Sequence, residues 1–365
     1  MSMLVTGGAG FIGANFVHHR RASHPQERLV VLDALTYAGN LQSIAPLLDA
    51  GEVHFVRGDI CDDALLARLF AEHDFAQVVH FAAESHVDRS IVAPDAFVRT
   101  NVNGTLSLLK AALAAHRKTG TLQRFHHVST DEVYGSLGLS DPAFQETTAY
   151  APRSPYAASK AASDHLVNAY GHTYGLLITI SNCSNNYGPF HFPEKLIPLM
   201  IVNLLQGKPL PVYGQGANIR DWLHVSDHCT AISAILDRGR AGETYNVGGN
   251  SEVANLELVH QLCDAFDARF LGDPDLRRRF PASPASQGRP SRELVTFVQD
   301  RPGHDYRYAV DTSKISAELG VRPLVALADG LASTIGWYLD NEAWWRSVMT
   351  GEYQNWVNSH YGAAS

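Results

Sequence analysis

Short apolar runs alternate with longer segments of mixed polarity over the first half of the chain. The runs predict strands at residues 3–6, 29–32, 53–57, 77–81, 124–128 and 176–181. The segments between them are long enough for helices, and the longest cover residues 95–118 and 154–174. Because strands that alternate with helices pair in parallel, this pattern predicts an α/β fold with a doubly wound parallel sheet.

The first predicted strand runs into a glycine-rich turn whose glycines include Gly7, Gly10 and Gly13, and residues 14–20 then continue as a helix. Glycines let the backbone approach a pyrophosphate, which the free N–H groups of the helix N-terminus hold. Such a pattern also fits an ordinary tight turn. The second strand, however, ends at Asp33, where a carboxylate accepts hydrogen bonds from the adenosine ribose. No Arg follows at residues 34–36 to neutralise a 2′-phosphate, so the sequence predicts NAD rather than NADP.

A second pattern lies in the helix that Ser154 and Pro155 begin. Tyr156 and Lys160 stand four residues apart and share one face of this helix. A nearby ammonium and a nicotinamide charge favour phenolate, so we expect the pKa of Tyr156 to be lowered and Tyr156 to act as a base on a sugar hydroxyl. Tyr and Lys at this spacing are also common on plain helix surfaces. The dinucleotide pattern upstream favours the functional interpretation.

Composition excludes several classes of protein. The 365 residues carry 29 Lys and Arg against 37 Asp and Glu, a net charge of −8 that argues against nucleic-acid binding. No apolar run reaches the length of a membrane span, and the chain begins as a strand rather than as a leader. The four scattered cysteines predict reduced thiols and a cytoplasmic location. The eighteen histidines show no metal-ligand spacing, so we predict no metal site.

Nine segments together resemble the extended short-chain dehydrogenase/reductases that modify nucleotide sugars, most closely the 4,6-dehydratases of dTDP-glucose. The similarity runs from Met3 to about Tyr361. It rests on TGGAGFIG from Thr6, LTYAGN from Leu35, AAESHVDRS from Ala82, STDEVYG from Ser129, SPYAASK from Ser154, NCSNNYGP from Asn182, HFPEKLIPL from His191, RDWL from Arg220 and DRPGHD from Asp300. The resemblance implies a Rossmann-like sheet with a smaller α/β substrate-binding domain.

The resemblance also implies a reaction: oxidation of the sugar at C4, elimination of water across C5 and C6, and return of the hydride to C6. An isolated Asp-Glu pair is usually solvated loop, but here Glu132 would remove the C5 proton. Asp131, kept protonated by burial or by its acidic neighbour, would protonate the departing C6 hydroxyl. Thr130 would hydrogen-bond the C4 oxygen, and Lys160 would anchor the nicotinamide ribose.

Binding residues carry over from the resemblance position by position. Those expected at NAD are Gly7, Gly10, Phe11, Ile12, Gly13, Asp33, Asp59, Ile60, Ala82, Thr100, Tyr156, Lys160 and Asn186. Those expected at the sugar nucleotide are Ser85, Thr130, Asn185, Lys195, Leu196, Tyr213, Arg220, Asn255, Arg301 and His304. A diphosphate needs cationic or N–H donors, and an arginine offers them as a fork.

Larger-scale expectations follow from the same resemblance. Residues 1–180 would form most of the NAD-binding domain, and residues 181–365 mainly the nucleotide-sugar domain, with later segments returning to the sheet. The helices at 95–118 and 154–174 resemble those through which the family forms homodimers. His224 and Phe190 stand where tyrosines are usual, which bears on nucleotide preference. The Arg- and Pro-rich segment from Leu271 to Glu293 is expected to be an exposed, mobile loop, with a phosphate-contacting lid as the alternative.

Three other functions stay open at this stage. The same dehydration on UDP-glucose or another nucleotide hexose would keep the chemistry and change only recognition of the base. A nucleotide-sugar 4-epimerase would share the cofactor and the Tyr-Lys pair, but it needs no adjacent acid and base for C5 and C6. A catalytically inactive NAD-sensing protein is the third, and intact Tyr156, Lys160, Asp131 and Glu132 argue against it.

Overall fold

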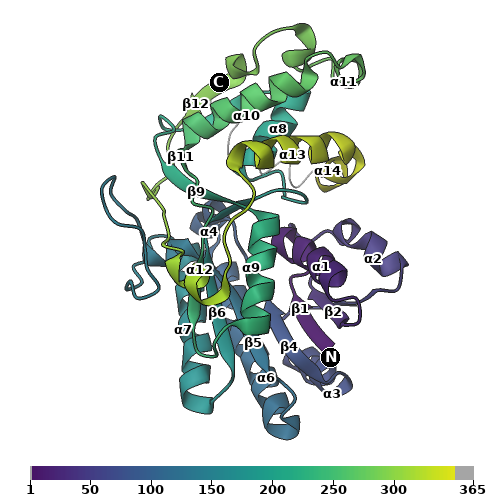
Figure 1. The fold of residues 1–365 in the computed structure, drawn as a ribbon, viewed down its shortest axis with the longest axis vertical. Helices are drawn as coiled ribbons and strands as arrows, with labels where there is room; N and C mark the ends of the chain where they lie inside the picture. Colours follow the sequence, from purple (N-terminus) through teal and green to yellow (C-terminus); the bar gives the residue numbers. More distant parts are fainter. Residues whose placement is uncertain (1, 350–365) are drawn as a thin grey trace.

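A seven-stranded parallel sheet forms the centre of the computed structural model, which describes residues 2–349 (Figure 1). The strands pair in the order β10-β6-β5-β4-β1-β2-β3. Their bounds are β1 Ser2–Thr6, β2 Arg28–Asp33, β3 Val53–Arg57, β4 Phe75–His80, β5 Arg124–Thr130, β6 Ile178–Cys183 and β10 Thr244–Val247. The predicted doubly wound sheet is confirmed. The order reverses between β1 and β4, which is where such sheets bind ligands.

Helices cover both faces of the sheet because neighbouring strand residues point to opposite sides. On one face, Met3 and Val5 pack with residues of α1 (Phe11–Ser23) and α9 (Val225–Arg238). On the other, Leu4 packs with residues of α3 (Asp63–Glu72), α6 (Thr105–Thr119) and α7 (Pro155–Tyr174). The helix expected at 95–118 is divided: α5 (Pro94–Phe97) leads into a π-helical segment, Val98–Gly104, before α6 begins.

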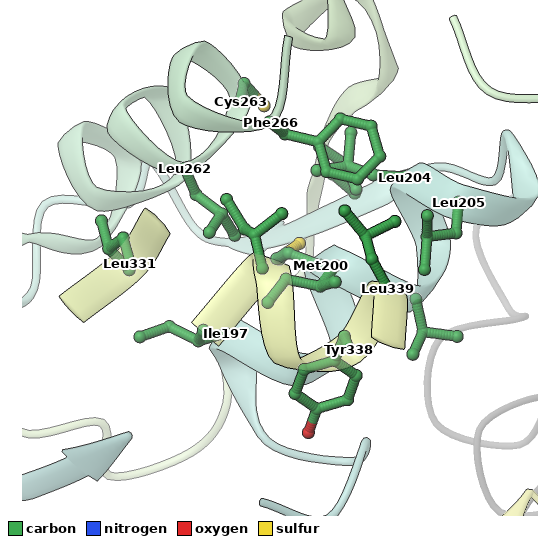
Figure 2. Packing of buried hydrophobic residues seen from close by; sticks show 14 of the residues in the cluster. Ile197, Met200, Leu204, Leu205, Leu262, Cys263, Phe266, Leu331, Tyr338 and Leu339 are labelled. Carbon is green, nitrogen blue, oxygen red and sulfur yellow. The ribbon is translucent and has the colours of Figure 1, made fainter. Parts of the chain in front are cut away.

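The later part of the chain builds a second core at one end of the sheet. Figure 2 shows Leu262 and Phe266 of α10 (Asn255–Phe270) facing Met200 of α8 (Leu196–Gln206). Tyr338 of α13 (Leu327–Asp340) belongs to the same cluster. The remaining elements are α2 Ala45–Asp49, α4 Val87–Val92, α12 Ser313–Leu319, α14 Glu342–Val348, β7 Asn185–Tyr187, β8 Leu210–Tyr213, β9 Ile219–His224, β11 Glu252–Ala254 and β12 Val295–Val298. Two small sheets, β11-β9-β7 and β12-β8, make this part a smaller α/β unit, as predicted.

The segment from Leu271 to Glu293 is largely exposed, as predicted, but it is not an irregular loop. The segment contains α11 (Pro274–Arg279), and Leu276 and Phe280 are buried in the core beside α10. Ser291 closes the segment by donating to the carboxylate of Asp267 through both its N–H and its hydroxyl. The two apolar residues stand four apart, on one side of a helix whose other residues are mostly charged. The Arg- and Pro-rich composition of this segment does not show that it contains a small amphipathic unit. This unit lies away from the seven-stranded sheet (Figure 1).

Candidate active site

The glycine turn after β1 has the geometry that a dinucleotide phosphate requires. Gly7 has φ +71°, and a Cβ there would lie 2.6 Å from the backbone nitrogen of Ala82. A Cβ at Gly13 would lie 2.2 Å from the carbonyl oxygen of Gly7. Helix α1 begins at Phe11, inside the turn, so its N-terminal N–H groups face the same space. The turn therefore leaves the backbone, and no side chain, to meet a ligand.

This turn opens onto a cavity of about 490 Å³ at the carboxyl ends of β1 and β4. All the residues predicted for the cofactor line it, as do all five predicted for catalysis. Of the residues predicted for the sugar nucleotide, the cavity lining includes Ser85, Thr130, Asn185, Lys195 and Leu196. The structure thus brings segments from residue 7 to residue 196 together around one space.

Asp33 ends β2 with its carboxylate buried at the cavity. One oxygen accepts the N–H of Ala9 at 2.9 Å and the other accepts the N–H of Leu35 at 2.8 Å. Burial raises the pKa of Asp33, and these two backbone bonds oppose the rise. Arg99 also lines the cavity, but it is paired with Asp59 at 2.7 Å. A fixed acid beside the glycine turn fits the hydroxyls of an NAD ribose.

The acidic pair begins the turn that follows β5. The hydroxyl of Thr130 accepts the N–H of Glu132 at 3.3 Å and donates to a carboxylate oxygen of Asp131 at 3.4 Å. Burial raises the pKa of Asp131 well above its ordinary value, and the charges of Glu132 and Asp221 raise it further. Burial also raises the pKa of Glu132, but there Arg301, Lys195 and Arg220 act in the opposite direction. The two adjacent acids therefore experience different fields.

Tyr156 and Lys160 lie in the first turns of α7, directly beside β5. The ammonium of Lys160 donates to the carbonyl oxygen of Val128 at 2.8 Å. Burial lowers the pKa of Lys160 and raises the pKa of Tyr156 well above its ordinary value, an effect that the charge of Glu132 reinforces. Without a bound cofactor the pKa of Tyr156 is therefore raised, and the lowering predicted from the ammonium together with a nicotinamide charge stays a prediction. The positive charge of a bound nicotinamide would act in the required direction.

Five residues predicted for the sugar nucleotide are not part of the cavity lining. Arg220 donates to the carbonyls of Ile219 and Asp305 at 2.8 and 2.9 Å, and its guanidinium lies 4.3 Å from the ring centre of Tyr308. Its two terminal nitrogens therefore donate to the backbone, and the predicted fork toward a diphosphate stays a prediction. The other four are Tyr213, Asn255, Arg301 and His304.

Two of these four meet at the same carboxylate. The hydroxyl of Tyr213 lies 3.4 Å from one oxygen of Asp88, and Arg301 lies 3.5 Å from the other. His304 contacts Asp300 at 2.6 Å, in the loop after β12. Arg301 nevertheless acts on Glu132 through its charge. It therefore influences the acidic pair from just outside the lining.

The family model described as GDP-mannose 4,6 dehydratase matches residues 4–334. The chain belongs to this family. It is 54% identical over 357 residues to the dTDP-glucose 4,6-dehydratase of Xanthomonas campestris pv. campestris (strain B100), covering 96% of this chain and 97% of the relative. The dTDP-glucose 4,6-dehydratase of Salmonella typhimurium is 48% identical over 99% of both chains. DesIV, the dTDP-glucose 4,6-dehydratase of Streptomyces venezuelae crystallised with NAD and TYD bound, superimposes with a TM-score of 0.84 at 47% identity, over 95% of this chain and 100% of DesIV.

Sequence reasoning missed one group at the cavity of this family member. Glu194 lines it and accepts two hydrogen bonds from Arg89, at 3.1 and 3.0 Å. The guanidinium of Arg89 in turn lies 4.0 Å from the ring centre of Tyr37. All three residues belong to segments that mark the resemblance, but none of them was among the predicted site residues. Their joint occurrence was the available signal, because an acid, a cation and an aromatic ring form a natural packed unit.

The two departures from the family pattern lie outside the cavity lining. His224 caps α9 through Ser226 and packs against Tyr187. Phe190 has φ +62° and packs against Trp337. Within residues 2–349, no cluster of His, Cys, Asp or Glu has the arrangement to hold a metal ion, and no helix is long and apolar enough to cross a membrane.

Proposed function

We propose that the protein converts dTDP-glucose to dTDP-4-keto-6-deoxyglucose with NAD as its cofactor. The observation that carries the proposal is the acidic pair: Asp131 and Glu132 line the cavity that Tyr156 and Lys160 also line, and more cations act on Glu132 than on Asp131. An elimination needs one acid and one base at adjacent carbons, whereas an epimerisation at C4 needs neither. The names of the relatives support the same reaction.

NAD, when bound, supplies the hydride chemistry by accepting hydride from C4 and releasing it to C6. Tyr156, as phenolate, takes the proton of the C4 hydroxyl, and Lys160 stabilises the phenolate. Glu132, as carboxylate, takes the C5 proton, which the C4 ketone makes acidic. Asp131, as carboxylic acid, protonates the C6 hydroxyl, and the C6–O bond breaks to release water. Glu132 then returns its proton to C5.

Counting protons over this cycle leaves one transfer unaccounted for. Tyr156 ends with a proton that it lacked at the start, and Asp131 ends without the proton that it gave to water. Thr130 lies beside both groups, because its hydroxyl donates to Asp131 at 3.4 Å and acts on the pKa of the Tyr156 phenol. Thr130 therefore passes the proton from Tyr156 back to Asp131, in addition to its bond to the C4 oxygen.

The remaining site assignments belong to the same proposal. The glycine turn and Asp33 hold the adenosine half of NAD, and Lys160 holds the nicotinamide ribose. Ser85, Asn185, Lys195 and Leu196 hold the sugar nucleotide, with Arg301 closing the space beside Glu132. Residues 1–180 act mainly on NAD and residues 181–365 mainly on the sugar nucleotide, although β10 of the later part completes the sheet and the end of this range lies outside the described residues.

A cytoplasmic homodimer is the proposed form of the protein. Apolar side chains remain exposed on α4 and the following π-helical segment, at Ile91, Val92 and Val98. A second copy would cover them, as expected for association through helices. All four cysteines are free thiols, which suits a reducing compartment. Light scattering tests the dimer, and cell fractionation tests the location.

One incubation tests the reaction. The purified protein is given dTDP-glucose or UDP-glucose, and the products are identified by NMR. We expect a 4-keto-6-deoxy product from dTDP-glucose, at a higher rate than from UDP-glucose, and none from the Glu132→Gln variant. Formation of dTDP-galactose would establish an epimerase instead. Turnover of neither sugar would indicate an NAD-binding protein without this activity.

A further inference from the structure

A charged cluster lies beneath the cavity and has no part in the mechanism so far. Asp164 stands one turn after Lys160 on α7 and is completely buried. His127 of β5 lies between them, its Nε2 3.3 Å from the ammonium of Lys160 and 3.1 Å from a carboxylate oxygen of Asp164. His127 and Asp164 are both absent from the cavity lining, whereas Lys160 belongs to it. The cluster is thus the inner support of a residue at the site.

The second oxygen of Asp164 carries the hydrogen bonds of this carboxylate. The hydroxyl of Ser129 donates to it at 2.8 Å and the hydroxyl of Tyr150 donates to it at 3.1 Å. Ser129 comes from β5, directly before Thr130, and Tyr150 comes from the loop before α7. Three elements therefore fix the carboxylate in one position. Such bonds favour its ionised form.

Charge balance explains why a carboxylate stands here. An ammonium taken out of water needs a nearby opposite charge, since carbonyl and imidazole partners satisfy its hydrogen bonds without neutralising it. Burial lowers the pKa of Lys160, and the charge of Asp164 opposes this lowering more than any other charge. Burial raises the pKa of Asp164 to about 6, so the carboxylate remains ionised at neutral pH.

Other titratable groups face this cluster from each element packed against it. They are His80 on β4, Cys183 on β6, His165 on α7, Tyr134 in the turn after β5 and Tyr150 in the loop before α7. Burial lowers the pKa of His80 and that of His127 well below the ordinary value and raises the pKa of Cys183 to about 12. These three groups are therefore uncharged at neutral pH, and Asp164 is the charge that matches the ammonium.

We propose that Asp164 is a positioning residue of the dehydratase: through its charge, and with His127 between them, it keeps Lys160 protonated and directed at the cavity. The inference rests on the proposed function, because the value of a charged Lys160 lies in stabilising the phenolate of Tyr156. Asp164 itself touches neither the sugar nor the cofactor.

Asp164→Asn tests the inference, because the amide keeps the shape and one acceptor oxygen but removes the charge. The alkaline limb of the kcat profile, where Lys160 loses its proton, should move to lower pH by about one to three units. Tyr150→Phe, which keeps the charge and removes one hydrogen bond, should move it far less. Asp227→Asn is the matched control, since Asp227 is buried and accepts the N–H groups of Leu324 and Val325. Asp227→Asn should not shift the alkaline limb of the kcat profile. If Asp164→Asn did not shift it either, the proposal would be overturned.

A stability cycle gives a reading that needs no substrate. Lys160→Met, Asp164→Asn and the double variant are compared by urea unfolding. If the two charges balance each other, the double variant should lose much less stability than the sum of the two single losses. Additive losses would overturn the charge pairing, even if Asp164→Asn is too unstable to assay. Coupling in a protein that turns over neither sugar would instead leave the pairing intact and refute the proposed function.

Discussion

The two ends of the site hold their charges in contrasting ways. At the lysine end, defined by Lys160, His127 and Asp164, one cation meets one fixed carboxylate within two adjacent elements, β5 and α7. At the acid end, defined by Asp131 and Glu132, the cations come from the loops around residues 195 and 301. Burial raises the carboxyl pKa at both ends, so burial alone does not decide which carboxyl is ionised.

The comparison shows that counter-charges assign the roles. Asp131 is next to two further acids, Glu132 and Asp221, and is therefore suited to carry a proton. Glu132 faces Arg301 and Lys195, and is therefore suited to lose one. Asp164 accepts two hydroxyl hydrogen bonds on one oxygen, and the charge of Lys160 favours its ionised form, so it is suited to stay charged. Residues 127–132, at the end of β5 and the start of the following turn, contribute side chains to both ends of the site.

The largest effect should come from removing the base at the acid end. Glu132→Gln should lower the rate of water elimination by about 10² to 10⁴, because a positioned base contributes that much. Oxidation at C4 depends on the lysine end and should persist, so the cofactor should become reduced without release of the 4-keto-6-deoxy sugar. Rapid-mixing absorbance and product analysis measure the two steps separately. Equal loss of both steps would show that the two ends do not work independently.

The next effect concerns the hydroxyl that joins the ends. Thr130→Val should allow a first turnover and then slow the following ones by about 10- to 100-fold, because the proton no longer returns from Tyr156 to Asp131. Quench-flow product formation should show a burst of one product per site. Thr130→Ser, which keeps the hydroxyl, is the control and should retain fast steady turnover. If the first turnover and the later turnovers were slowed by the same factor, Thr130 would act in C4 oxidation alone.

A smaller effect tests the cations at the acid end. Glu132 works as carboxylate, so activity falls as pH falls through its pKa, and Arg301 lowers that pKa. Arg301→Gln should therefore raise the pKa of Glu132 and move the acid limb of kcat to higher pH by about one unit. Saturating substrate separates this shift from weakened binding. Arg346→Gln, at an exposed pair with Glu342, is the control, and an identical profile for both variants would contradict the assignment.

The smallest effect on the site should come from the segment beside α10. Phe280→Ala should reduce the free energy of unfolding by about 3–5 kcal/mol, as expected for truncating a buried aromatic ring, while kcat stays near the wild-type value. Arg278→Ala, at an exposed position on the same helix, should change it by less than about 0.5 kcal/mol. Equal effects of the two substitutions in urea unfolding would restore the interpretation as an irregular loop.

Local patterns made the cofactor side of the cavity predictable. Gly7, Gly13 and Asp33 lie at strand ends whose positions follow from the apolar runs, and Tyr156 and Lys160 share a face by helix periodicity. The acidic pair was found because it directly follows a predicted strand. In each case the backbone geometry that places the residue is encoded within a few neighbouring positions.

The remaining features depend on contacts between distant segments. Arg220 was expected at a diphosphate, but its donors go to the carbonyls of Ile219 and Asp305, and no local pattern announces that partner. The role of Asp164 likewise depends on β5 lying beside α7. The direction of the Tyr156 pKa depends on total burial, which a four-residue spacing does not reveal.

A labelled substrate tests the central claim most directly. The protein is given dTDP-glucose deuterated at C4, in ordinary water, and the product is examined by NMR and mass spectrometry. The account predicts a 4-keto-6-deoxy sugar that carries the C4 deuterium at C6. A product that keeps both its C6 hydroxyl and the deuterium at C4 would contradict elimination by Asp131 and Glu132.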